Sequence, residues 1–167
     1  MADNPVYRLS IAIQAGIPAI WWGDSGIGKT AILSQVGPRL GFARTIVVSA
    51  AQLQAEDVSG LAMPDKDDGE RLARRFDDLF LDAARHPCLV IVDEFTRAID
   101  RATRNAFLRL FQEHSAGSLK LHPGTRKVAL ANPGSLDQDC RELPAALANR
   151  NYHETDKPSM ADYLDYM

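Results

Sequence analysis

The sequence has little cysteine, no long apolar run and no large excess of either charge. Only Cys88 and Cys140 could form a disulfide, and Cys88 stands in an apolar segment, where a free thiol behaves as a small buried hydrophobe. No apolar run approaches the roughly 20 residues of a membrane span, and the N-terminus lacks the basic start and apolar stretch of a secretion signal. We therefore expect a reducing, cytoplasmic setting and no membrane partner.

Charge and length narrow the class of protein further. The 19 basic and 22 acidic residues leave a net charge of −3, which argues against a strongly cationic surface for nucleic acid. The 167 residues suffice for one ordinary domain, and an apolar share of 46% can fill its core. We expect one compact unit without a nucleic-acid partner.

Four short apolar runs predict the strands of a parallel sheet. They lie at 17–22, 45–48, 89–92 and 128–131, and their apolar residues are continuous rather than alternating, as in strands covered on both faces. Residues 100–114 instead carry apolar side chains at helical spacing. Because strands and helices alternate along the chain, the pattern predicts an α/β fold.

Two segments between the strands carry turn signals. Residues 60–71 contain a proline and an Asp-Gly pair, which predict an exposed loop or small hairpin, with a disordered charged loop as the alternative. A second hairpin is predicted from Gly117 through a His-Pro-Gly turn at 122–124 into the strand at 128–131.

A glycine-rich segment follows the 17–22 run directly and leads into a helix start. Its spacing, Gly-x4-Gly-Lys-Thr, is the Walker A pattern in the strand-to-helix context that supports it. Glycines let backbone N–H groups wrap phosphates at a helix N-terminus, Lys29 supplies charge, and the Thr30 hydroxyl can ligate Mg²⁺. A glycine-rich turn that matches by chance is the alternative. The predicted nucleotide-binding residues are Gly23, Asp24, Ser25, Gly26, Ile27, Gly28, Lys29, Thr30 and Ala31.

Two acids, Asp93 and Glu94, follow the apolar run at 89–92. A buried strand ending in Asp-Glu has the form of a Walker B motif, in which Asp93 would hold Mg²⁺ and Glu94 would polarise the attacking water. The carboxyl end of a parallel strand is also where open α/β folds bind ligands. A merely solvated strand end is the alternative, and the Walker A pattern favours catalysis because each motif predicts the other.

Together these segments resemble an AAA+ ATPase of the MoxR and dynein-related branch, over most of the chain from Gly23 to Arg150. Residues 93–98 resemble that branch's DExNRA signature, with Thr96 where Asn is usual. Further similarity lies in 54–60 (the start of the helix-2 insert), 105–113 (the ALLxxMQE helix), 129–133 (the sensor 1 strand) and 142–150 (the ELxxAxxxRF segment).

The resemblance implies two catalytic residues beside the Walker B glutamate. Asn132 matches sensor 1, which orients the attacking water, although an Asn before a proline turn is the alternative. Arg150 stands where the family's arginine finger reaches the ATP of a neighbouring subunit; Asn151 departs from the usual aromatic there, and Arg141 is the competing finger. Arg97 is interpreted as an ion-pair partner or part of a solvated helix face.

The implied fold is a P-loop NTPase core of AAA+ type, with a mostly parallel five-stranded sheet flanked by helices. Residues 1–157 would form this core. Residues 158–167, with Ser159 as the cap residue, are predicted to begin a helical lid. The resemblance implies that a complete lid, with its sensor 2 residue, does not fit in the 17 residues after Arg150.

The resemblance further implies an ATPase that uses ATP and Mg²⁺, assembles into a ring, hexameric in the family, and remodels a client protein. Relatives often work with a von Willebrand factor A partner, and the hairpins predicted at 60–71 and 117–125 would contact the client. Without lid or neighbour, this chain alone is expected to hydrolyse ATP slowly.

A nucleotide-dependent binding module with little hydrolysis is the open alternative. A GTPase lacks support because no Asn or Thr precedes a Lys-x-Asp triplet that could select guanine. A small-molecule kinase also lacks support, because it would need neither the sensor 1 candidate nor the arginine-finger candidates.

Overall fold

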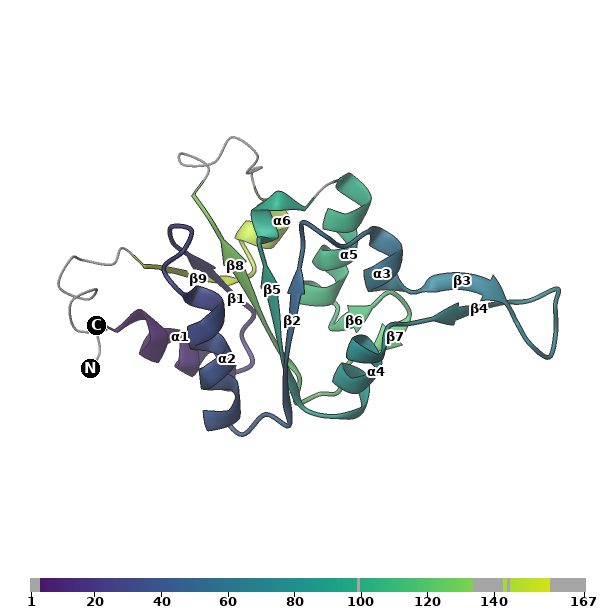
Figure 1. Ribbon diagram of the computed structural model, residues 1–167, viewed down its shortest axis with the longest axis horizontal. Helices are drawn as coiled ribbons and strands as arrows, with labels where there is room; N and C mark the ends of the chain where they lie inside the picture. The colour runs from purple at the N-terminus through teal and green to yellow at the C-terminus, as the bar shows by residue number, and fades with distance from the viewer. Residues whose placement is uncertain (1–3, 99, 134–142, 144, 157–167) are drawn as a thin grey trace.

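A five-stranded sheet forms the centre of the molecule (Figure 1). Its strands are β1 (Ala19–Trp22), β2 (Arg44–Ser49), β5 (Cys88–Asp93), β8 (Arg126–Ala131) and β9 (Tyr152–Thr155). They are ordered β2-β5-β8-β1-β9, and every neighbouring pair runs parallel. The computed structural model describes residues 4–98, 100–133, 143 and 145–156.

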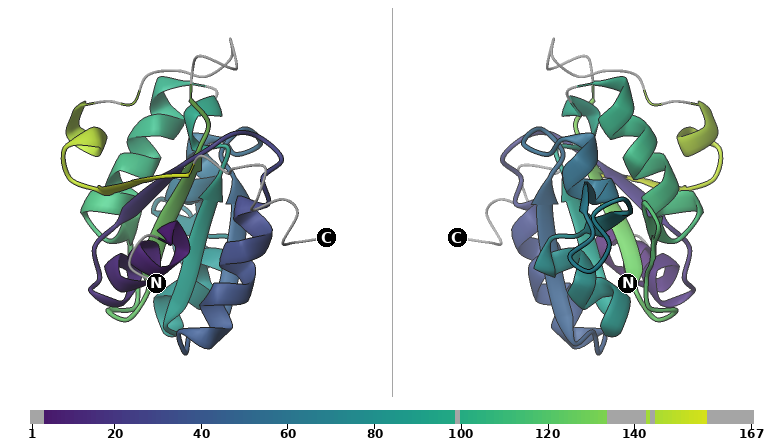
Figure 2. Two further views of the ribbon diagram at one scale, coloured as in Figure 1. Left: turned by 90° about the vertical axis from the view of Figure 1, so that its left-hand side faces the viewer. Right: turned by 90° about the vertical axis from the view of Figure 1, so that its right-hand side faces the viewer.

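Helices cover both faces of the sheet (Figure 2). α1 (Pro5–Gln14) and α2 (Lys29–Arg39) pack on one face, and α3 (Ala55–Ser59), α4 (Asp78–Arg85) and α5 (Arg101–Gln112) pack on the other. None of the helices in the described ranges has the length and apolarity needed to span a lipid bilayer. The remaining elements are the hairpin β3 (Leu61–Pro64)–β4 (Leu72–Arg75), the 3-10 turn η1 (Phe95–Arg97), the hairpin β6 (Ser115–Ala116)–β7 (Leu119–Lys120) and the short helix α6 (Ala145–Ala148).

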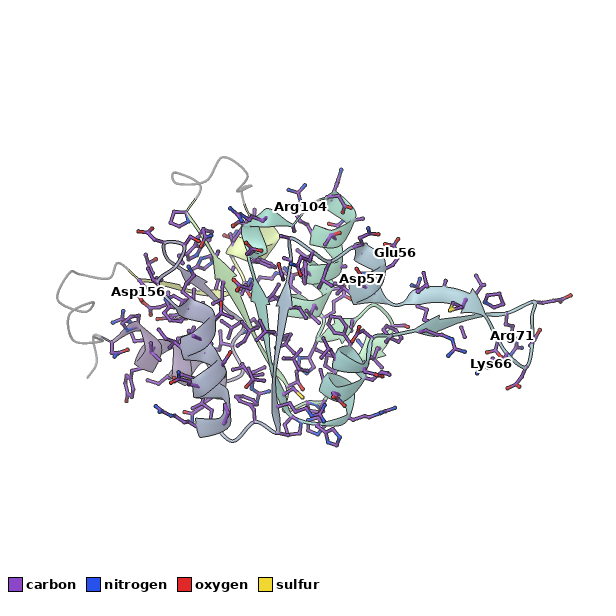
Figure 3. All side chains as sticks on the ribbon, viewed as in Figure 1. Glu56, Asp57, Lys66, Arg71, Arg104 and Asp156 are labelled. Carbon is purple, nitrogen blue, oxygen red and sulfur yellow. The ribbon has the colours of Figure 1, made fainter. Side chains whose placement is uncertain are left out.

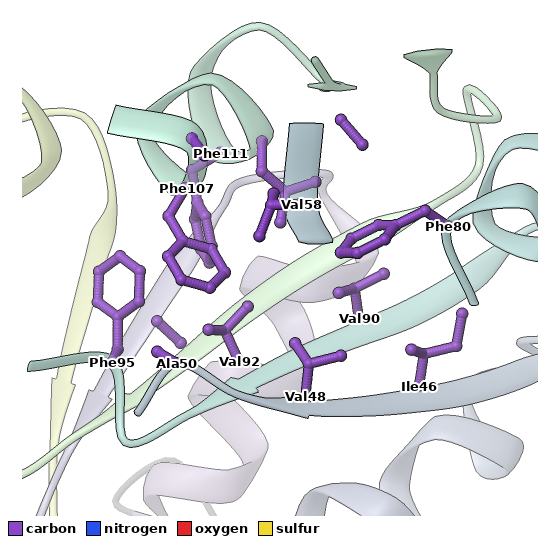
Figure 4. Packing of buried hydrophobic residues seen from close by; sticks show 14 of the residues in the cluster. Ile46, Val48, Ala50, Val58, Phe80, Val90, Val92, Phe95, Phe107 and Phe111 are labelled. Carbon is purple, nitrogen blue, oxygen red and sulfur yellow. The ribbon is translucent and has the colours of Figure 1, made fainter. Parts of the chain in front are cut away.

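The central strands are apolar throughout because both faces of the sheet are covered. Along β5, Val90 and Val92 belong to the core under α3, α4 and α5, whereas Leu89 and Ile91 belong to the core under α1 and α2. All four side chains are fully buried, as the period of two in a strand requires. The core on the face covered by α3, α4 and α5 includes Val58, Phe80, Phe95, Phe107 and Phe111 (Figure 4).

The predicted α/β fold is confirmed. Each of the four predicted apolar runs contains or overlaps a strand of the parallel sheet, and α5 falls within the predicted helix at 100–114. Asp100 caps the start of α5, since its carboxylate accepts a hydrogen bond from the Thr103 N–H at 2.7 Å. The thiol of Cys88 is free and buried, as expected. The lid helix predicted to begin in 158–167, and Arg141, lie outside the described residues.

Residues 60–71 contribute to a hairpin rather than a structureless loop. β3 and β4 pair antiparallel and extend away from the body of the molecule (Figure 1), with Lys66 and Arg71 in the loop at the far end (Figure 3). At the base, Gly60 has a φ of +82°, and a Cβ there would lie 2.7 Å from the Phe76 ring. The Arg74 guanidinium also donates to the Gly60 carbonyl at 2.7 Å. The hairpin is therefore anchored at its base and exposed along its length.

The second hairpin prediction is wrong in its register. β6 pairs with β7 through a turn at 117–118, and the turn at 122–124 instead leads into β8, which joins the central sheet. Packing explains the difference: Gly117 has a φ of +57°, and a Cβ there would lie 2.2 Å from the Ser59 carbonyl oxygen. Only glycine fits this close approach, so the chain reverses there.

An ion pair that the sequence did not predict joins α1 to the edge strand β9. The Arg8 guanidinium donates to both carboxylate oxygens of Glu154, at 2.9 and 2.8 Å, and the Tyr152 hydroxyl donates to the same carboxylate at 2.6 Å. Glu154 is only 5% exposed. These hydrogen bonds, chiefly those from Arg8, hold the pKa of Glu154 below its ordinary value of 4.5.

We expect the Arg8→Ala substitution to lower the thermal unfolding midpoint in a pH-dependent way. A carboxyl group whose pKa is lowered on folding stabilises the fold fully above its unfolded-state pKa and loses that contribution as the pH falls through the lowered value. The gap between wild type and Arg8→Ala should therefore be widest at neutral pH and narrow below pH 4.5. Arg44→Ala, which removes an exposed pair with Asp82, is the control and should have a small effect. A gap of constant size down to pH 3 would contradict this account of Glu154.

Candidate functional site

The polar residues singled out in the sequence meet at the carboxyl ends of the parallel strands. The glycine-rich loop joins β1 to α2, and Asp93 is the last residue of β5. Asn132 directly follows β8. Ser49, which the sequence analysis did not single out, ends β2, the strand beside β5. Because parallel strands end at one edge of their sheet, these side chains share one site.

The glycine-rich loop needs glycine for its backbone conformation. Gly26 and Gly28 have φ values of +84° and +82°, and a Cβ at either position would meet no atom within 4 Å. Gly28 is also the residue that caps α2, without any side-chain hydrogen bond to the first turn of that helix. The outer residues of the loop, Asp24 and Ser25 among them, are exposed. The loop thus presents open backbone and a helix N-terminus, the features that bind phosphate groups.

Lys29 is a buried cation that donates hydrogen bonds to uncharged oxygens. It is 7% exposed, and its ammonium donates to the carbonyls of Gly23 and Asp24 at 2.7 and 2.8 Å and to Asn132 Oδ1 at 3.1 Å. Burial lowers the pKa of Lys29, against the opposing charges of Asp93, Asp24 and Asp156. An anion at the loop would relieve the cost of burying this charge.

A hydroxyl and a carboxylate lie together beside this lysine. The Thr30 hydroxyl donates to Asp93 Oδ2 at 2.6 Å, while Asp93 Oδ1 accepts a hydrogen bond from the Glu94 N–H at 2.8 Å. The two residues come from different elements, the first turn of α2 and the end of β5. Their adjacent oxygens are the hard donors that Mg²⁺ prefers.

Glu94 is held between two side chains. One carboxylate oxygen accepts a hydrogen bond from the Ser49 hydroxyl at 2.9 Å, and the other forms an ion pair with Arg97 at 2.9 Å. The backbone of Glu94 is left-handed, with a φ of +51°, a conformation that costs energy for a residue with a side chain and that clusters at functional sites. The side chain is 36% exposed, so water has access to it.

The structure separates Arg150 from this cluster and adds residues to it that the sequence had not placed there. Arg150 is exposed and donates to Gln112 Oε1 of α5 at 3.1 Å. The Arg97 interpretation as an ion-pair partner is confirmed. Ser49 was missed because a lone serine after an apolar run carries no motif, although its place at the end of a strand beside β5 was a usable signal.

A family model now accounts for the combination of loop, acids and parallel sheet. The model for the AAA domain of the dynein-related subfamily matches residues 18–158. The chain belongs to this AAA family. The match covers every residue of the described site and confirms the predicted fold class, a P-loop AAA+ core around a five-stranded sheet. Family membership supports a nucleotide-dependent activity for this AAA domain.

A solved structure shares the fold of this AAA domain. It is the 2.00 Å crystal structure of a "putative ATPase" from Cytophaga hutchinsonii ATCC 33406, with a TM-score of 0.66 and 18% sequence identity. The superposition covers 97% of this chain and 48% of that one, so the AAA domain spans about half the length of that protein. At this identity the likeness concerns the fold alone. No protein of curated function matches the AAA domain in sequence.

Proposed function

We propose that this AAA domain binds Mg-ATP at the glycine-rich loop and hydrolyses it when a neighbouring subunit completes the site. The observation that carries the proposal is Lys29, a buried ammonium whose three hydrogen bonds all go to neutral oxygens beside an open loop. A triphosphate would offer this ammonium negatively charged acceptors in place of neutral ones. Hydrogen bonds with an ionised partner are about twice as strong as neutral ones. Family membership supports the nucleotide.

The residues present fit Mg²⁺ as the metal. Thr30 and Asp93 already bring a hydroxyl and a carboxylate oxygen within 2.6 Å of each other. Mg²⁺ keeps several waters and takes only one or two protein ligands beside phosphates, so the lack of a three-residue acidic or histidine cluster among the described residues agrees with it. When bound, the metal would neutralise charge on the phosphates. Thr30 and Asp93 would hold it there.

Glu94 and Asn132 are proposed to act on the attacking water. Glu94 would accept the water's proton and align its oxygen, as a positioned carboxylate does in phosphoryl transfer. Asn132 lies against the Lys29 ammonium, the group proposed to contact the β- and γ-phosphates. Its amide would orient the same water from the end of β8.

Arg150 is proposed to serve the nucleotide of a second subunit. The side chain is exposed on the α5 side of the molecule, where a neighbouring copy can reach it. An arginine supplied to the triphosphate in this way can accelerate hydrolysis on the order of 10³ to 10⁵. AAA+ proteins generally assemble into rings, and we propose a hexamer. Arg141 stays the alternative finger.

In the whole protein we propose that the ring remodels a client protein, and a von Willebrand factor A protein is the proposed partner class. The exposed β3–β4 hairpin would be one contact.

The competing function is a binding module whose shape ATP changes without hydrolysis. The hydrogen bond from Ser49 to Glu94 and the ion pair of Glu94 with Arg97 favour it. Phosphate release measured against protein concentration decides between the two. A rate per subunit that rises with concentration supports hydrolysis in an assembly, and ATP binding without phosphate release at any concentration supports the binding module.

The Thr30→Val substitution should remove most of the Mg²⁺ dependence of ATP binding. Valine keeps the shape of threonine but has no hydroxyl to ligate a metal or to contact Asp93. We expect calorimetry to show that Mg²⁺ tightens ATP binding to the wild type roughly tenfold more than to the variant. Thr45→Val is the matched control, because the buried Thr45 hydroxyl has no hydrogen-bond partner among the residues that the structure describes. An equal gain from Mg²⁺ in Thr30→Val and wild type would remove Thr30 from the metal site.

A further inference from the structure

The edge strand β9 presents different side chains to the two sides of the sheet. Glu154 points towards α1, where Arg8 donates to its carboxylate, and the Tyr152 hydroxyl donates to the same carboxylate. His153 alternates with them and therefore lies on the opposite face of the sheet. Within the sheet, β9 pairs with β1 in parallel register. This histidine is absent from the proposed catalytic set, yet it contacts two segments that lead to that set.

The contacts of His153 fix one neutral form of its ring. The Trp22 indole N–H donates to His153 Nδ1 at 2.9 Å, and the two rings stack with centroids 6.1 Å apart and planes inclined by 13°. Since Nδ1 accepts this hydrogen bond, the proton of the neutral ring resides on Nε2. The Nε2–H then donates to the Ala148 carbonyl at 2.7 Å. One imidazole thus bridges Trp22 and Ala148.

Each end of the bridge adjoins part of the proposed site. Trp22 is the last residue of β1 and directly precedes Gly23, the first glycine of the loop. Its carbonyl also accepts a hydrogen bond from the Asp156 N–H at 2.8 Å, just past β9. Ala148 is the last residue of α6, and Arg150 follows two residues later. The bridge therefore connects the start of the phosphate loop to the turn that carries Arg150.

The α6 segment depends on such tethers for its position. It is four residues long, and an isolated helix of one turn is unstable because forming its first turn fixes several residues for one hydrogen bond. Figure 2 shows α6 at the margin of the molecule, with β9 following it. The segment packs beside α5, and its anchors include the His153 hydrogen bond to Ala148 and the hydrogen bond from Arg150 to Gln112 of α5.

We propose that His153 is a positioning residue, which holds the α6 turn and Arg150 at a fixed place relative to the glycine-rich loop of the same subunit. The part concerning hydrolysis rests on the proposed trans action of Arg150. The bridge makes the placement of Arg150 depend on the strand that precedes the phosphate loop. A subunit's own loop therefore influences how it presents its arginine to the next subunit.

Two substitutions of His153 separate the two halves of the bridge. His153→Asn keeps an acceptor at the position of Nδ1 for Trp22, but its side chain is too short to reach Ala148. His153→Gln places an amide N–H near the position of Nε2 and keeps the donor to Ala148 while losing the acceptor for Trp22. Each variant loses one hydrogen bond and the imidazole, so a purely structural role predicts similar effects for both.

Hydrogen exchange tests the placement without reference to hydrolysis. The Asn149 amide donates to the Ala145 carbonyl at 2.9 Å and reports whether the α6 turn is formed. We expect His153→Asn to lose protection of this amide and His153→Gln to retain it. Equal protection of the amide in all three proteins, or equal loss in both variants, would overturn the tether.

Steady-state hydrolysis tests the consequence at a protein concentration where the rate per subunit has reached its plateau. In His153→Asn we expect kcat to fall roughly tenfold to a hundredfold with KM for ATP unchanged, because misplacing a catalytic group by about 1 Å can cost on the order of 10² in rate. His153→Gln should stay near the wild-type kcat. Where Arg150→Ala is slow, equal kcat values in the two variants would overturn the inference.

The Arg150→Ala variant distinguishes failure of the inference from failure of the proposed function. If Arg150→Ala hydrolyses ATP at the wild-type rate, the proposed role of Arg150 is wrong, and the exchange result alone judges the tether. If Arg150→Ala is slow while His153→Asn shows normal kcat and normal Asn149 protection, the role of Arg150 stands and the positioning role of His153 is wrong.

Discussion

Replacing Lys29 with methionine is expected to weaken ATP binding by roughly 100-fold, because a charge-assisted hydrogen bond to a phosphate contributes about 1.5–3 kcal/mol. Methionine has nearly the length of lysine and no charge. The thermal unfolding midpoint should change little, because the penalty of burying the ammonium disappears with the charge. Calorimetric titration with ATP and Mg²⁺ measures the first effect, and thermal unfolding measures the second.

A second buried lysine provides the matched control for this experiment. Lys127 is 6% exposed, comparable to Lys29, and burial lowers its pKa to about 8. Its ammonium donates to the Phe111 carbonyl at 3.3 Å and approaches His114 Nδ1 at 2.8 Å, at the C-terminal end of α5. Lys127→Met should leave ATP affinity unchanged, and its effect on the thermal midpoint should be as small as that of Lys29→Met, because the penalty of burying its ammonium also disappears with the charge. If Lys29→Met and Lys127→Met bind ATP as the wild type does, Lys29 has no role at the phosphates.

The Glu94→Gln substitution should stop turnover and leave nucleotide binding intact. Glutamine is isosteric but cannot accept the proton of the attacking water, and loss of a general base typically costs about 10² to 10⁴ in rate. The substitution also removes the ion pair with Arg97, but both side chains are more than a third exposed, so the fold should change little. We expect ATP to bind and phosphate release to fall by that factor.

The control for Glu94→Gln is Glu56→Gln, which neutralises an exposed acid on α3 (Figure 3). It should hydrolyse ATP at the wild-type rate. Turnover in Glu94→Gln equal to that of Glu56→Gln would show that another group activates the water, and the catalytic assignment would move to a different residue.

The parts of this fold that sequence reasoning found are those with a local physical cause. β5 was predictable because both faces are covered and every residue from Cys88 to Val92 is buried. The glycine-rich loop was predictable because Gly26 and Gly28 need a left-handed backbone at fixed spacing before a helix. The proximity of Thr30 and Asp93 then followed from strand polarity alone.

The parts that sequence reasoning missed depend on contacts between distant segments. β9 is a polar edge strand whose conformation is set by pairing with β1 and by the ion pair of Arg8 with the buried Glu154 carboxylate. The reversal at Gly117 is set by its approach to the Ser59 carbonyl. Ser49 joins the site only because β2 lies beside β5. None of these leaves a local pattern in the sequence.

The measurement that tests the central claim most directly is a calorimetric titration of the wild-type chain with ATP and with GTP in the presence of Mg²⁺. We predict saturable binding of ATP at one site and much weaker binding of GTP, since no Asn or Thr followed by Lys-x-Asp is present to select guanine. Binding of neither nucleotide would contradict the proposal that the glycine-rich loop and the buried Lys29 form an ATP site.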